Sequence, residues 1–236
     1  LGDLDGDGNV DIAVSANLDD DGSYDRGAVY ILFLNSNGTV KDEQKISDTE
    51  GGLVTAINTF DYFGTSVANI GDLDNDGVID LAVGAKQDDD GGADAGSVYI
   101  LFLNTDGTVK DEQIISDTYG GLVEDLEMFD YFGTSVTGVG DLDGDGTEDI
   151  AVGAYGDDDD NSLAGAVYIL FLNSDGTVKD EQKISDTTGG LTGELDDNDW
   201  FGFSVTRVGD IDLDGNEDIV VGAPFDDDES LNEGAM

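Results

Sequence analysis

The sequence predicts an all-β fold, built from four-stranded antiparallel units that form part of a β-propeller. An acidic phrase recurs every 69 residues, beginning at Gly2, Gly71, Gly140 and Gly209, and a fixed period of this kind indicates one copied supersecondary unit. Each complete copy also holds four segments with the composition of strands. Convincing helical periodicity is absent, and only residues 122–129 could form a turn of helix.

The complete unit that begins at Tyr62 shows how the first two strands are expected. Strand A covers Tyr62–Ile70, which is rich in the aromatic and β-branched residues that favour strands. The acidic loop Asp72–Asp80 follows it, and strand B covers Leu81–Ala85. Strand B contains a Gly-Ala pair in three units, at Gly84, Gly153 and Gly222, where we expect neighbouring units to approach closely.

The second half of the unit supplies two further strands. A loop rich in glycine and aspartate leads to strand C at Ser97–Asn104, and a turn at 105–107 joins it to the more polar strand D, Thr108–Ser116. Strand C is apolar on both faces, which carry Tyr99, Leu101 and Leu103 on one side and Val98, Ile100 and Phe102 on the other. A strand buried on both faces indicates units stacked face to face, as in a β-propeller.

The repeat also divides the chain into four parts. Residues 1–61 form a partial unit with strands B, C and D and a connection; 62–130 and 131–199 form full units; 200–236 supply strands A and B only. Both ends of the chain fall inside a unit, so we expect a fragment of a larger propeller whose remaining blades belong to the same parent chain.

Composition excludes several classes of function. The chain of 236 residues has 56 acidic and eight basic side chains, for a formal net charge of −48. Its electrostatic field therefore repels nucleic acids and anionic membranes. The longest apolar run, Ala28–Leu34, is too short to cross a bilayer, so we expect no membrane insertion. Catalysis is not expected, because histidine and cysteine are absent and the abundant carboxylates recur with the repeat instead of marking one place.

The acidic loop is the strongest functional signal. In the second copy, aspartate occupies positions 1, 3, 5 and 9 and glycine occupies position 6. Four carboxylates on nine residues repel one another unless a cation binds them. Hard oxygen ligands select Ca²⁺ or Mg²⁺, and the irregular set of four carboxylates and one carbonyl favours Ca²⁺. The loop is not an EF-hand, because position 12 is a valine within strand B in all four copies.

We therefore predict four Ca²⁺ sites, in which the ions stabilise the hairpin between strands A and B. The side chains at position 7 share no ligand chemistry, so their backbone carbonyls are the expected ligands there. The predicted ligands are Asp3, Asp5, Asp7, Asn9 and Asp11; Asp72, Asp74, Asp76, Val78 and Asp80; Asp141, Asp143, Asp145, Thr147 and Asp149; and Asp210, Asp212, Asp214, Asn216 and Asp218.

A second set of acidic runs follows strand B in each copy, at 19–21, 88–90, 157–160 and 226–229. These runs are either further cation sites or solvated charge, and solvated charge is the preferred interpretation. The aromatic pairs that start strand A, such as Tyr62-Phe63 and Trp200-Phe201, are expected to pack between units.

Three motifs together resemble a known family. The Phe-Gly pairs at Phe63, Phe132 and Phe201, the acidic loops, and Gly222-Ala223-Pro224 are similar to FG-GAP repeats, the blades of the integrin α-subunit β-propeller and its bacterial relatives. The first copy departs from this pattern with Val14-Ser15-Ala16, and only the last copy has the proline. The resemblance implies cell-surface adhesion.

These observations lead to one functional hypothesis with two alternatives. We expect an extracellular, secreted or cell-surface recognition module stabilised by Ca²⁺. Its unknown protein or glycan ligand would bind the face formed by the B–C and D–A loops, since long variable loops on a rigid scaffold build binding surfaces. The alternatives are an accessory propeller domain of a secreted hydrolase, and a passive spacer in a large surface protein.

Overall fold

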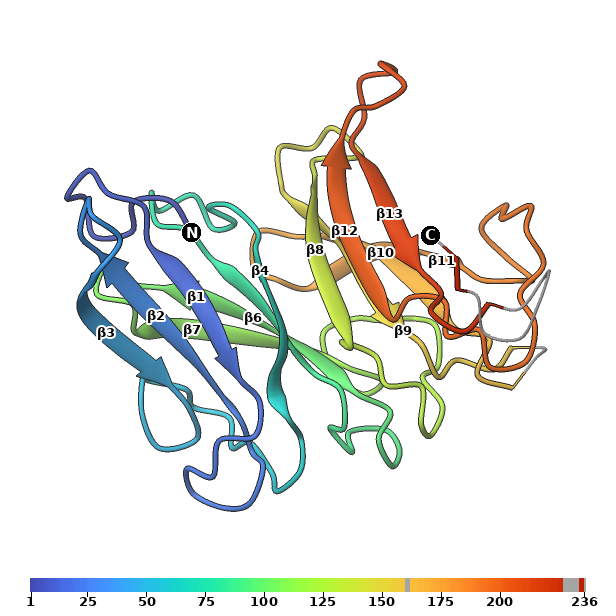
Figure 1. Cartoon of the computed structure of the whole chain (residues 1–236), viewed down its shortest axis with the longest axis horizontal. Helices are drawn as coiled ribbons and strands as arrows, with labels where there is room; N and C mark the ends of the chain where they lie inside the picture. Colours follow the sequence, from blue (N-terminus) through green and yellow to red (C-terminus); the bar gives the residue numbers. More distant parts are fainter. Residues whose placement is uncertain (160–161, 227–233, 236) are drawn as a thin grey trace.

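The computed structural model describes residues 1–159, 162–226 and 234–235, and these residues form only strands, turns and loops (Figure 1). Residues 122–129 lie in turns and irregular backbone, so the helical turn considered for them does not form. The strands are β1 (Ile12–Ala16), β2 (Ala28–Leu34), β3 (Val40–Ile46), β4 (Phe63–Asn69), β5 (Leu81–Ala85), β6 (Ser97–Leu103), β7 (Val109–Ile115), β8 (Ser135–Gly140), β9 (Asp149–Ala154), β10 (Ala166–Leu172), β11 (Val178–Ile184), β12 (Ser204–Gly209) and β13 (Asp218–Gly222).

The strands form four antiparallel sheets that follow chain order. Sheet 1 is β1-β2-β3, sheet 2 is β4-β5-β6-β7, sheet 3 is β8-β9-β10-β11, and sheet 4 is β12-β13. In sheet 2, each predicted strand agrees with the structure to within one residue at either end. The predicted four-stranded antiparallel units are confirmed in sheets 2 and 3, and strand D lies at the edge of both.

Strand β6 shows why the sheets stack. All seven of its residues are buried. Tyr99, Leu101 and Leu103 join an apolar cluster with sheet 1, whereas Val98, Ile100 and Phe102 join a separate cluster with sheet 3. The two-faced burial predicted for strand C is confirmed.

The first strands of neighbouring sheets come closest together, and β1, β4, β8 and β12 lie side by side in turn (Figure 1). A Cβ atom on Gly84 would lie 1.9 Å from the carbonyl oxygen of Gly133, so only glycine fits there. Gly153 meets Gly202 in the same way, also at 1.9 Å. The hydroxyl of Ser66 donates a hydrogen bond of 2.9 Å to the Gly133 carbonyl. The close approach predicted for the Gly-Ala pairs is confirmed where two successive sheets meet.

The connections between sheets form a second contact that the sequence analysis missed. The backbone N–H of Val109 donates to the carbonyl of Gly51 at 2.8 Å, which ties β7 to the connection that leaves sheet 1. The carboxylate of Glu112 then accepts hydrogen bonds from the N–H groups of Val54 and Thr55. The same bonds recur one repeat later, at Val178 with Gly120 and at Glu181 with Val123 and Glu124.

Antiparallel order gives each sheet two different ends. Loops between strands A and B lie at one end with the C–D hairpins, and we name this the A–B end. The B–C loops and the D–A connections lie at the opposite end, which we name the B–C end.

Candidate metal-binding loops

The aspartate at position 1 folds each acidic loop. In the second loop, Asp72 accepts hydrogen bonds from the N–H groups of Asp76 at 2.9 Å and Gly77 at 2.8 Å, one on each carboxylate oxygen. Gly77 has a φ of 92°, a backbone conformation that favours glycine. The corresponding bonds form in the other three loops, at Asp3, Asp141 and Asp210. The aspartate at position 1 and the glycine at position 6 therefore produce the same turn in all four loops.

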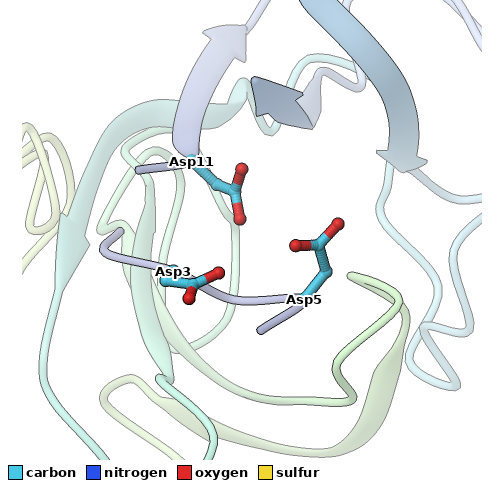
Figure 2. A group of neighbouring side chains, drawn as sticks. All are labelled: Asp3, Asp5 and Asp11. Atoms are coloured by element: carbon cyan, nitrogen blue, oxygen red, sulfur yellow. The ribbon is translucent and has the colours of Figure 1, made fainter. Parts of the chain in front are cut away.

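This turn brings three carboxylates together in every copy. One oxygen from each of positions 1, 3 and 9 lies within 4.8 Å of the others. Figure 2 shows Asp3, Asp5 and Asp11 pointing toward a common space. The four groups are Asp3, Asp5 and Asp11; Asp72, Asp74 and Asp80; Asp141, Asp143 and Asp149; and Asp210, Asp212 and Asp218.

The carboxylate at position 9 anchors the loop to the sheet. Asp80 is fully buried and accepts hydrogen bonds from the N–H of Leu73 at 2.9 Å and of Leu103 at 3.1 Å. Burial raises the pKa of Asp80 to about 6, and the nearby charge of Asp74 adds to this rise. Asp149 has the same bonds and a pKa that burial also raises. A nearby cation would offset this cost of a buried negative charge.

Position 5 does not join the converging group. Asp76 turns one oxygen to the N–H of Val78 at 2.8 Å and pairs the other with the ammonium of Lys110. Of the other position-7 residues, Asn9 and Asn216 donate their side-chain amides to position 5 of their own loops. The structure thus brings positions 1, 3 and 9 together and places positions 5 and 7 beside them, where their predicted role stays a prediction.

A lysine at the start of strand D reaches each of the first three loops, and the sequence analysis missed it. The ammonium nitrogen of Lys110 lies 2.6 Å from Asp74 at position 3 and also contacts Asp76. Lys41 pairs with Asp5 and Asp7, and Lys179 pairs with Asp143 and Asp145. The signal was present in the sequence, because Lys41, Lys110 and Lys179 are themselves 69 residues apart.

These contacts show that the loops attract positive charge. The hydrogen bond from Lys41 holds the pKa of Asp7 below its usual range, and the bonds to Asp5 and Asp7 raise the pKa of Lys41. The ammonium is a cation held by two loop carboxylates, and one of these, at position 3, also belongs to the converging group. This donor set, made only of oxygen, fits a hard divalent cation such as Ca²⁺ or Mg²⁺.

The carboxylates at the B–C end are arranged differently. Asp88 is buried and accepts hydrogen bonds from Ser97 at 2.9 Å and Tyr99 at 3.3 Å. Asp157 is also buried, and its carboxylate lies 2.7 Å from the ammonium of Lys183. Among the described residues, converging groups of three carboxylates occur in the acidic loops and not at this end. Asp160 and residues 227–229 of the predicted acidic runs lie outside the described residues.

The aromatic residues that start strand A pack as predicted, at least in part. Phe63 is buried between sheets 1 and 2, where its ring meets Tyr99 edge to face with centroids 5.2 Å apart. Phe132 makes the same contact with Tyr168 at 5.4 Å. Tyr131 instead stacks on Tyr155 at 4.9 Å, at the B–C end.

Comparison with known proteins identifies the repeat. The family model of the FG-GAP repeat matches residues 63–101 and 132–170, which run from strand A into strand C of sheets 2 and 3. The chain carries FG-GAP repeats. The acidic loops of these two repeats lie within the matched segments.

The chain is also similar to integrin alpha subunits. It is 32% identical to integrin alpha-3 of Cricetulus griseus over 200 residues, which make up 85% of this chain and 17% of that protein. It is 36% identical to integrin alpha-6 of Gallus gallus over 200 residues, or 85% of this chain and 16% of that protein. Integrin alpha-PS2 of Drosophila melanogaster shares 37% identity over 162 residues. The chain thus spans less than a fifth of the length of these relatives.

Proposed function

We propose that this FG-GAP chain is part of a Ca²⁺-binding β-propeller that serves recognition or adhesion at the cell surface. The observation that carries the proposal is the convergence of positions 1, 3 and 9 in all four loops. Residues 62–130 and 131–199 are then full blades, while 1–61 and 200–236 are parts of two further blades. Other blades of the parent chain complete the ring, in keeping with the similarity to much longer integrin alpha subunits.

The chemistry of the loops supports Ca²⁺ in particular. A set of four carboxylates and one backbone carbonyl suits the flexible coordination of Ca²⁺ better than the near-ideal octahedron that Mg²⁺ requires. Additional ligands would come from position 5 and from the backbone carbonyl at position 7, as in the predicted set. The ion would link the loop to position 9, which is anchored in the sheet, and so stabilise the hairpin between strands A and B.

The recognition surface is proposed at the B–C end. The B–C loops differ in sequence between copies, whereas the acidic loops of the A–B end keep the same residues at positions 1, 3, 5, 6 and 9. A variable end on a repeated scaffold suits binding to a protein or glycan ligand. An extracellular location follows from the resemblance to integrin alpha subunits. Among the described residues, no helix is long and apolar enough to cross a membrane.

Calorimetric titration with Ca²⁺ tests the metal sites. We expect the chain to bind four ions, and the double variant Asp72→Asn/Asp74→Asn to bind three. The matched control is Asp111→Asn/Asp180→Asn, which removes two exposed carboxylates from β7 and β11, outside the acidic loops, and should still bind four. Four ions in the loop variant would show that the ligand assignment is wrong, and no binding by the unmodified chain would refute the metal function itself.

A further inference from the structure

The lysines at the start of strand D share ligands with the proposed metal. Asp74 belongs to the converging group of the second loop, and its carboxylate also lies 2.6 Å from the ammonium of Lys110. In the first loop, Asp5 has the same double role, with Lys41 at 2.5 Å. In the third loop, Asp143 is shared with Lys179 at 2.8 Å. An ammonium and a divalent ion therefore draw on the same carboxylates.

The three lysine side chains can move away from the loop carboxylates into solvent. Each is the second residue of an edge strand and keeps about a fifth to a third of its side-chain surface exposed, as in Lys110 at 26%. Contacts within the loop also hold the two carboxylates that the lysine contacts, because Asp74 accepts a hydrogen bond from the N–H of Asp76, and Asp76 accepts one from the N–H of Val78. An ammonium on a flexible four-carbon stem can withdraw into solvent without opening a cavity.

We propose that Lys41, Lys110 and Lys179 are internal counter-ions that compete with Ca²⁺ and set the affinity of the first three loops. Without metal, the ammonium bridges positions 3 and 5 and offsets the repulsion among the loop carboxylates. When the ion binds, it takes over these oxygens and the lysine moves out. This inference rests on the proposed Ca²⁺ function and assigns a role in it to a residue outside the ligand set.

Substitution of one lysine tests the competition. Gly77, Gly8 and Gly146 occupy position 6 of three loops, so their backbone amide signals in NMR spectra report Ca²⁺ binding to each loop separately. In Lys110→Gln, the Ca²⁺ midpoint of Gly77 should fall about tenfold, which corresponds to about 1.4 kcal/mol. The midpoints of Gly8 and Gly146 should stay the same.

A matched control separates competition from bulk charge. Lys86 lies over the ring of Tyr155 at the B–C end, and Lys86→Gln changes the net charge by the same single unit. This control should leave the Gly77 midpoint unchanged. An unchanged or higher midpoint in Lys110→Gln would overturn the proposal, because the lysine would then be neutral toward the ion or would assist its binding.

Chemical labelling tests the release directly. Lysine amines are acylated with an N-hydroxysuccinimide ester, and the rate at each site is followed by mass spectrometry with and without Ca²⁺. We expect Ca²⁺ to accelerate labelling of Lys41, Lys110 and Lys179 and to leave Lys86 unchanged. Equal rates in both conditions, in a protein whose glycine amides respond to Ca²⁺, would refute the lysine role alone. If no glycine amide responds to Ca²⁺, the metal function fails and the lysine role fails with it.

Discussion

Both ends of the sheets carry many carboxylates, but the carboxylates are arranged and paired differently at the two ends. At the A–B end, three carboxylates of each loop converge on one space, and the groups include exposed side chains such as Asp3. At the B–C end, buried carboxylates such as Asp88 and Asp157 are bonded to hydroxyls or to a lysine of the same sheet. Acidic composition alone therefore does not distinguish the two ends, whereas the direction in which the carboxylates point does.

Sheets 2 and 3 extend the comparison within the B–C end. Lys183 in sheet 3 bridges Asp157 and Asp159, at 2.7 Å each, and Lys45 makes the equivalent bridge in sheet 1. The same repeat position in sheet 2 holds Ile114. Sheet 2 thus has the acidic run without its internal cation, in an otherwise closely similar fold. Four predictions test these differences between the two ends and between the sheets.

Removal of Ca²⁺ should have the largest effect, because it acts on all four loops of the A–B end at once. At a hundred times its dissociation constant, Ca²⁺ stabilises the folded state by about 2.7 kcal/mol for each independent site. A chelator such as EGTA should therefore lower the melting temperature sharply in scanning calorimetry. In the Asp72→Asn/Asp74→Asn variant, the Ca²⁺-dependent part should shrink by about one site's share. A melting temperature that does not change with the chelator would contradict the proposal that bound cations stabilise the fold.

Among the single substitutions, loss of Lys183 should have the largest effect, because it leaves two carboxylates of the B–C end without their cation. The Lys183 side chain is 10% exposed, and Asp157 beside it is 4% exposed. Removing one partner of a buried ion pair costs about 3 kcal/mol. We expect this loss for Lys183→Met in urea unfolding with chelator present.

The control lies on the same strand. Lys179→Met removes a lysine from β11 at the A–B end, where the ion pairs are more exposed, so the free energy of unfolding should fall by much less than in Lys183→Met. Equal losses in the two variants would show that the two ends do not differ in the way described here.

Sequence reasoning went far because the fold is repeated. The strands of sheet 2 follow from the two-sided apolar pattern of β6 and from the turn signals around it. The same pattern recurs in the other copies and supports the same strand assignment there. The convergence of positions 1, 3 and 9 follows from their spacing, because a nine-residue hairpin loop with a glycine at position 6 can fold in few ways. Local rules of this kind can be read from one copy.

Contacts between distant segments could not be read in the same way. The hydrogen bonds that Glu112 accepts from the N–H groups of Val54 and Thr55 join residues 58 and 57 positions apart, and Glu112 lies in a polar strand whose sequence resembles that of any solvated edge strand. The pairing of Lys110 with Asp74 depends on how the C–D hairpin lies over the A–B loop. Such contacts depend on the packing of whole elements and not on local sequence pattern.

The pH dependence should expose a third feature of the B–C end. Burial raises the pKa of Asp61 to about 7, assisted by the charge of Asp88, and burial raises that of Asp130 to about 7. These carboxyls bind a proton more tightly in the folded state than in the unfolded chain, where their pKa has its ordinary value of 3.8, so stability falls as pH rises toward and through 7.

Acidification from pH 8 to pH 5 should thus stabilise the chelated protein, by on the order of 2 kcal/mol for each carboxyl. Urea unfolding at the two pH values, with chelator present so that metal release plays no part, measures this gain. Asp61→Asn should lose the share of one carboxyl, whereas Asp111→Asn, on an exposed face, should keep all of it. A stability that rises from pH 5 to pH 8 would contradict the assignment.

The smallest expected effect comes from giving sheet 2 the cation that its neighbours have. Burial raises the pKa of Asp90, whereas the hydrogen bond from Lys45 holds that of its equivalent in sheet 1, Asp21, below the usual range. Ile114→Lys should lower the pKa of Asp90 instead of raising it, which carboxyl ¹³C chemical shifts would show on titration.

The gain in stability at pH 8 should be only about 1 kcal/mol, because the new ion pair is offset by the loss of a partly buried isoleucine that packs against the core between sheets 1 and 2. If Asp90 keeps its raised pKa, the place of Ile114 is not equivalent to that of Lys45 and Lys183, and the contrast between the sheets has another origin.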